Sequence, residues 1–160
     1  MSTIYYHFTG NMLRDGRAIP SIGEWLEFDG TPVPCKSGLH ASPDAFDALQ
    51  YAPGTILHQV ELGGKIVATI NAEAIMRLFA RRVALDVIHL WDAPTIVKEY
   101  LETGDESKRN AAGAAAAAAA GAAASWDAAW GTAGGAKQKL YRGWFNEMVE
   151  TEFALQAVRP

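Results

Sequence analysis

A tract made only of alanine and glycine constrains the second half of the chain. Every residue between Asn110 and Ser125 is alanine or glycine. Alanine has the highest helix propensity, so the tract predicts a helix. Its side chains carry no polar or charged group, and the tract can therefore act only through packing. Gly113, Ala117 and Gly121 share one helix face, where we expect another element to approach the backbone closely.

The helical pattern continues beyond the tract but is interrupted by three glycines: Gly131, Gly134 and Gly135. A second apolar stripe follows at helical spacing: Tyr141, Trp144, Phe145 and Met148. One helix over residues 105–155 would be roughly 75 Å long at a rise of 1.5 Å per residue. That length is large for a chain of this size, so we expect a helical hairpin that turns at the glycines. A single long, protruding helix is the alternative, because the apolar spacing continues across them.

The first 70 residues have a different periodicity, typical of strands. β-Branched and aromatic residues predict strands over residues 3–9, 55–62 and 65–70. Gly63 and Gly64 join the last two as a tight hairpin.

Two further elements are predicted in the front half. Residues 24–35 alternate apolar and polar side chains across Asp29 and Gly30, a strong hairpin signal. Ser42 precedes a proline and predicts the N-cap of a short helix over residues 43–51.

The helical period begins at Asn71, which we expect to cap a helix. Asp92 and Pro94 then open another helix, which Gly104 ends, and Asp105 restarts the pattern. The sequence therefore predicts an α+β protein. Residues 1–70 form a small antiparallel sheet with one short helix, and residues 71–160 form a helical region packed on it, as one compact domain with a helical extension.

Length and composition support one domain with its own core. The chain has 160 residues and 49% hydrophobic content, enough to bury a core without disulfides. Its single cysteine, Cys35, cannot form an intramolecular disulfide, which suits a reducing compartment. The sequence shows neither a signal peptide nor an apolar run long enough to span a bilayer. We therefore expect a soluble, cytoplasmic protein with no membrane association.

The charge distribution bears on the kind of partner. The formal net charge is −4, and the lysines and arginines are mostly scattered along the chain. A surface that binds nucleic acid normally gathers its basic residues on one face. The composition argues against nucleic acid as the main ligand and favours a protein partner with a basic surface.

Most residues with chemical potential lie in the front half, in the segments YHFTG, CKSGLHAS and AFDALQYAPG. Their order resembles the ADP-ribosyltransferase-like fold, including its RNA 2′-phosphotransferase branch, whose His-x-Ser step matches His40 and Ser42. The resemblance implies that His7 and His40 contact an NAD cofactor and that Tyr51 stacks on nicotinamide. Three of these residues also have a structural explanation: His7 as a half-buried strand residue, Ser42 as a helix cap and Tyr51 as a helix end. His40, between Leu39 and Ala41, has no such explanation from propensity.

A metal site has little support in the sequence. Cys35 and His40 form one loose pair that His58 could join across a sheet. Structural zinc sites usually show two closely spaced ligand pairs. We therefore expect no metal site.

A second resemblance is carried by the tail rich in alanine, tryptophan and aspartate and by four segments: YYHFTG, CKSGLHAS, DALQYAPG and HLWDAPTIVKEYLETGDE. Taken together, they resemble a family of uncharacterised proteins of bacteriophages and bacterial mobile elements. The resemblance covers nearly the whole chain. It implies a phage accessory protein that modulates a host system, including a defence system.

Two functional hypotheses follow. The first is a non-enzymatic protein without a cofactor that binds a host protein or protein complex, as a counter-defence inhibitor would. Tryptophan is enriched at interface hot spots, and Trp126, Trp130 and Trp144, together with Ser42, are the candidate binding residues. The alternative is an NAD-using transferase that acts through His7, His40 and Tyr51.

Overall fold

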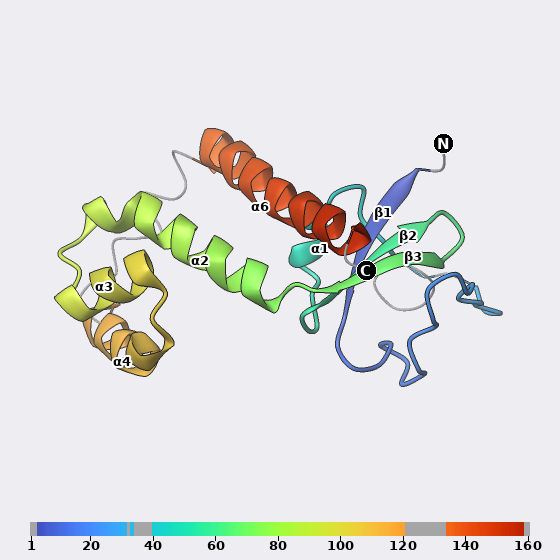
Figure 1. Cartoon of the computed structure of the whole chain (residues 1–160), viewed down its shortest axis with the longest axis horizontal. Coiled ribbons are helices and arrows are strands. Elements are labelled where there is room, and N and C mark those ends of the chain that lie inside the picture. Colours follow the sequence, from blue (N-terminus) through green and yellow to red (C-terminus); the bar gives the residue numbers. More distant parts are fainter. Residues whose placement is uncertain (1–2, 32, 34–39, 121–133, 159–160) are drawn as a thin grey trace. The chain divides into compact units, whose positions relative to one another are not determined.

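The computed structural model describes residues 3–31, 33, 40–120 and 134–158 (Figure 1). These residues form two compact units. The sheet unit contains the described residues up to Ile75 and those from Trp144 onward, and the helical unit contains Met76–Gly143. The end of the chain thus belongs with the front half, whereas the sequence placed the boundary after residue 70 and grouped residues 71–160 together.

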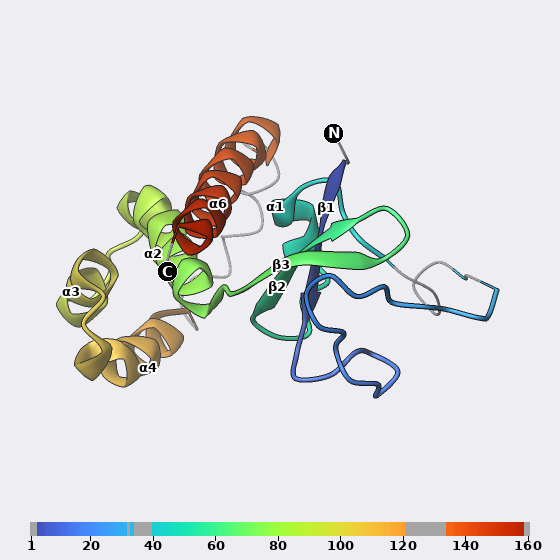
Figure 2. The ribbon, with the colours of Figure 1, turned by 45° about the vertical axis from the view of Figure 1, so that its right-hand side comes forward.

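The sheet unit contains a three-stranded antiparallel sheet, which confirms the predicted α+β class. Its strands are β1 (Ile4–Thr9), β2 (Ile56–Glu61) and β3 (Lys65–Asn71), in the order β1-β2-β3. All three agree with the predicted strands. Gly63 and Gly64 have φ angles of 99° and 96°, a left-handed conformation that glycine adopts without strain, and they turn the chain between β2 and β3. Figure 2 shows the three strands side by side, with α1 (Ala45–Leu49) near β1.

One face of this sheet carries the apolar core. Phe8, Leu57 and Ile70 are register partners across the three strands, and all are buried. The last helix, α6 (Gly134–Ala157), adds buried side chains at four-residue spacing: Phe145, Val149 and Phe153. The ring of Phe153 lies 6.5 Å from that of Tyr6 on β1, centroid to centroid. These contacts hold α6 against the sheet. An aromatic pair of this kind contributes to the free energy of unfolding beyond what burial of the two rings contributes.

α6 also contacts the short helix α1. The rings of Phe46 and Phe145 meet edge to face with centroids 6.4 Å apart. The backbone N–H of Phe46 donates to Oδ1 of Asn146 at 2.9 Å. The predicted stripe on α6 is present: Tyr141 and Phe145 are buried, and Trp144 and Met148 are half-buried.

The helices that follow β3 in the chain begin and end close to the predicted breaks. Asn71 accepts the N–H of Glu73 at 3.0 Å and so begins α2 (Glu73–Val87), which leads into the short helix η1 (Ile88–Leu90). α3 (Thr95–Thr103) ends at Gly104, whose φ of 68° is left-handed, as at many helix C-termini. Asp105 caps η2 (Glu106–Lys108), and α4 (Arg109–Ala120) contains the described part of the alanine tract.

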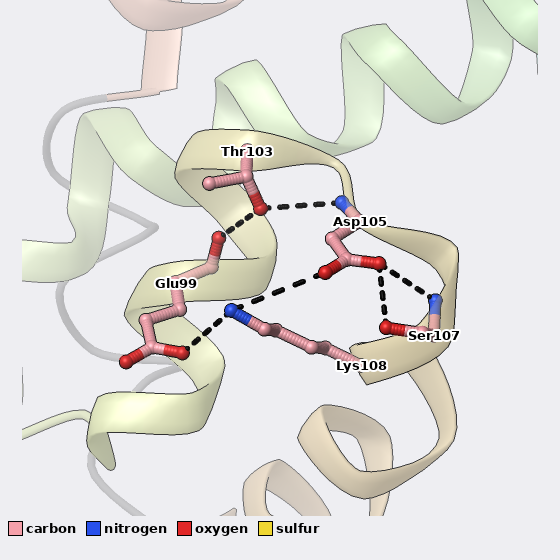
Figure 3. Close-up of polar contacts among 5 residues, drawn as sticks. All are labelled: Glu99, Thr103, Asp105, Ser107 and Lys108. Atoms are coloured by element: carbon pink, nitrogen blue, oxygen red, sulfur yellow. Dashed lines mark hydrogen bonds and ion pairs between the residues drawn. The ribbon is translucent and has the colours of Figure 1, made fainter.

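Polar contacts fix the corner between α3 and α4 (Figure 3). The ammonium of Lys108 lies 2.8 Å from Glu99 Oε2 and 4.0 Å from Asp105 Oδ2. The Thr103 hydroxyl donates to the carbonyl of Glu99 at 2.6 Å and accepts the N–H of Asp105 at 3.2 Å. These groups hold the chain in a defined turn, and the charged side chains of Lys108, Glu99 and Asp105 are all partly exposed to solvent.

Two local predictions in the front half are wrong. The first arm of the hairpin predicted over residues 24–35 forms no ladder across Asp29 and Gly30: Trp25 makes an isolated bridge with Lys65 instead. Pro32, Pro34 and Cys35 of the predicted second arm lie outside the described residues. The cap of α1 is Asp44, which accepts the N–H of Asp47 at 2.9 Å. Ser42 is held away from that role because its backbone pairs with that of Tyr6.

Two helical predictions also need correction. α3 has Pro94 at its N-cap and no side-chain cap, so Asp92 does not cap it. On α4 the packed face contains Ala112, which is buried in a cluster with Ala93 and Val97. Gly113 and Ala117 are exposed, so this part of the predicted close-approach face points to solvent.

Residues 121–133, which include Gly121 and Gly131, lie outside the described residues. The choice between a helical hairpin and one long helix depends largely on them. In the described residues α6 begins at Gly134, so its start coincides with the glycines where we expect the turn, and Gly135 follows within the first turn of the helix. No helix among the described residues has the length and apolar character needed to cross a membrane.

Candidate functional site

A polar row crosses the sheet next to the apolar one. His7 on β1 is the register partner of His58 on β2, and His58 is the partner of Thr69 on β3. Successive side chains in a strand point to opposite faces, so this row lies on the face opposite Phe8 and Leu57. Nε2 of His58 is 2.9 Å from the hydroxyl of Thr9, and Nδ1 is 2.8 Å from that of Thr69. Because a hydroxyl both donates and accepts, either neutral tautomer of His58 is satisfied.

Burial keeps this row uncharged. The side chain of His58 is 1% exposed, and burial, with a smaller contribution from the charge of His7, lowers its pKa to about 4. Burial also lowers the pKa of His7, although a hydrogen bond with the backbone of His40 partly opposes this. Both imidazoles are therefore neutral at pH 7, and the enclosed ring of His58 stabilises the sheet instead of reaching a ligand.

The structure brings together only some of the candidate residues. His7 and His40 are in hydrogen-bond contact through the His40 backbone. Ser42 pairs with Tyr6 through its backbone. Tyr51 follows α1 and is 63% exposed, outside the hydrogen bonds of the histidine row. Trp144 is half-buried on α6, and Trp126 and Trp130 lie outside the described residues.

The sequence indicated His58 only as a metal ligand and did not indicate Thr9 or Thr69. Pairing between strands, which no local pattern specifies, brings the three together. In the described part of the chain, no group of three or more His, Cys, Asp or Glu side chains could hold a metal ion. Cys35 lies outside that part.

Sequence reasoning also missed an exposed apolar surface at the β2–β3 hairpin. Ile22, Trp25 and Leu62 are 60%, 55% and 77% exposed, and we name them the hairpin-tip patch. The indole of Trp25 lies over Gly63: a Cβ placed on this glycine would be 3.0 Å from Cζ3. The ammonium of Lys65 is 5.9 Å from the centroid of the same indole. Large exposed apolar side chains that lie together are a common mark of a binding surface.

Comparison of the chain with models of protein families, with curated proteins and with solved structures finds no match in any of the three. The resemblance to a phage family therefore stays a prediction.

Proposed function

We propose that the chain is a non-enzymatic accessory protein that binds a host macromolecule through the hairpin-tip patch. The observation that carries this proposal is the 55% exposure of Trp25, whose neighbours are hydrogen-bonded to the β2–β3 hairpin and whose indole lies over Gly63, the residue after the exposed Leu62. Tryptophan is among the residues that most often cost 2 kcal/mol or more when truncated at an interface. The motif resemblance suggests the setting: the host cytoplasm and a host protein, with a defence component as the natural target of a phage-type inhibitor.

The backbone beneath the patch supports this role because it is preorganised. The N–H of Gly23 donates to the carbonyl of Ile66 at 2.7 Å, and the N–H of Leu26 donates to that of Gly64 at 3.0 Å. These bonds hold Trp25 against the hairpin before any partner arrives. A side chain held in its binding position loses less conformational entropy on association, so more of its contact energy appears as affinity.

The test is capture of partners from host lysate with the wild-type chain and with Trp25→Ala. Leu155→Ala is the matched control, since Leu155 is 48% exposed on α6 of the same unit. We expect Trp25→Ala to lose the captured partner and Leu155→Ala to retain it. A partner that Trp25→Ala still binds with unchanged affinity would overturn the proposal.

The contact between His7 and His40 favours a second candidate, an NAD-using transferase. In it these histidines would hold the cofactor and Tyr51, which is exposed, would stack on nicotinamide. NAD at about 100 times its dissociation constant would raise the free energy of unfolding by about 2.7 kcal/mol. Thermal unfolding with and without millimolar NAD, repeated on a His7→Ala plus His40→Ala variant, measures this. An unchanged melting temperature in the wild-type chain rejects this candidate.

A further inference from the structure

We infer that the hairpin-tip patch binds a basic protein segment, whose apolar side chain sits against Trp25 while its lysines or arginines face a rim of carboxylates. This inference rests on the proposed function and specifies the chemistry of the partner. It follows from the charges that surround the patch.

Both segments that form the hairpin-tip patch carry acidic residues, which we call the rim. Glu24, Glu27 and Asp29 are exposed on the segment that contains Trp25, and Glu61 directly precedes Leu62. Lys65 is the basic residue of the hairpin turn. Counted over these five described residues alone, four carboxylates against one ammonium sum to a formal charge of −3.

Two basic groups of the described residues near this rim, those of Lys65 and Arg17, have acidic partners. The Lys65 ammonium lies 3.9 Å from Glu61 Oε2. Arg17, whose charge also acts on Asp29, forms an ion pair with Asp15 at 2.8 Å. Its other contact here is a hydrogen bond to the backbone carbonyl of Glu27, which leaves the charge of that carboxylate in place. The exposed rim thus keeps an excess of negative charge that a basic partner would complement.

The same charge argues against two other occupants. A second copy of the chain would bring one acidic rim against another, and like charges across an interface cost free energy. Nucleic acid would bring phosphates against carboxylates, although phosphate contacts with basic side chains normally supply most of its affinity. A basic protein segment satisfies both the apolar centre and the acidic rim.

The probe is a set of fluorescein-labelled peptides of about 12 residues with a central Leu-Leu pair. One version has four flanking arginines, and matched versions have four glutamines or four glutamates. Binding to the full chain is followed by fluorescence anisotropy at low salt. We expect saturable binding of the arginine peptide, at least about tenfold tighter than that of the glutamine peptide, and none of the glutamate peptide, since each exposed ion pair contributes up to about 1 kcal/mol.

Two variants separate the rim from the overall charge. Glu27→Gln plus Asp29→Asn removes two rim charges, and Glu147→Gln plus Glu150→Gln removes two exposed charges on α6 of the same unit. The rim variant should weaken the arginine peptide about fivefold or more and the α6 variant less than twofold. Equal losses in the two variants, equal binding of the three peptides, or no saturable binding of the arginine peptide up to about 1 mM would overturn the inference.

The partner captured from lysate separates this inference from the proposed function. A partner lost in Trp25→Ala but bound equally well by Glu27→Gln plus Asp29→Asn would leave the proposed function standing and overturn the basic-segment inference. Occupation of the patch by a nucleic acid, or by a second copy seen as a concentration-dependent mass, would overturn it in the same way.

Discussion

His58 lies directly across from His7 in the β1–β2 register, and its imidazole is held between the hydroxyls of Thr9 and Thr69. This places a fully buried, neutral base within the sheet unit. Its protonation is therefore coupled to folding of this unit.

Acid should destabilise the sheet unit. The pKa of His58 is about 4 in the folded protein against about 6.5 when unfolded. The unfolded chain consequently binds more protons below pH 6.5, and stability falls as the pH falls from about 6.5 towards 4. His58 alone should cost about 2 kcal/mol between pH 7 and pH 5, and the lowered pKa of His7 acts in the same direction. Urea unfolding followed by the NMR signals of β2 at the two pH values measures this loss.

His58→Gln and His89→Gln are the matched variants for this measurement, since His89 is exposed in the helical unit. His58→Gln should be less stable at pH 7 but should lose most of the pH dependence. His89→Gln should behave like the wild-type chain. A pH dependence that His58→Gln leaves intact would show that another group is responsible.

Removing the Thr9 hydroxyl should also destabilise the sheet unit. Thr9 is 2% exposed, and Thr9→Val leaves Nε2 of His58 buried without this hydrogen bond. An unsatisfied buried polar atom costs about 1–3 kcal/mol. Urea unfolding at pH 7 checks the value, with the exposed Thr3→Val as a control expected to stay within about 0.5 kcal/mol. Equal stability of the two variants would mean that the hydroxyl contributes little.

Two glycines of the helical unit should respond oppositely to alanine. Gly104 has a φ of 68°, and a Cβ there would overlap Nη1 of Arg81, a buried atom. Gly104→Ala should therefore cost at least about 1–2 kcal/mol. A Cβ at Gly113 would have no atom of the described residues within 4 Å, so Gly113→Ala should stabilise α4 by about 0.5–1 kcal/mol. Urea unfolding followed by the NMR signals of α3 and α4 compares them. A change of the same sign in the free energy of unfolding of both variants would contradict the left-handed backbone at Gly104 or the open helix face at Gly113.

The strands and most helix boundaries could be predicted because local signals specify them. Gly63 and Gly64 form the expected turn, and Gly104 ends α3 as predicted. Asp29 and Gly30 give an equally strong local signal, but the preceding backbone pairs with the β2–β3 hairpin instead. Long-range backbone pairing outweighs the local turn propensity there. The same holds for Ser42, whose backbone pairs with that of Tyr6, so that Asp44 caps α1.

The candidate site was harder to predict because register and exposure define it. A lone histidine on β2 gives no indication that hydroxyls from both neighbouring strands will enclose it. The exposure of Trp25 is likewise a property of the folded hairpin, where Gly63 leaves room for the indole. The motifs implied that His7 and His40 contact one cofactor; the structure places the backbone of His40 against His7, and the contact with a cofactor stays a prediction.

The most direct test of the proposed function is NMR mapping of the sheet unit with the captured host partner. The indole N–H signal of Trp25 and the methyl signals of Ile22 and Leu62 report on the hairpin-tip patch, and the methyl signals of Leu155 report on an exposed site outside it. We predict that the partner shifts or broadens the patch signals at substoichiometric amounts and leaves those of Leu155 unchanged. Unchanged patch signals in the presence of a saturating partner would contradict the account.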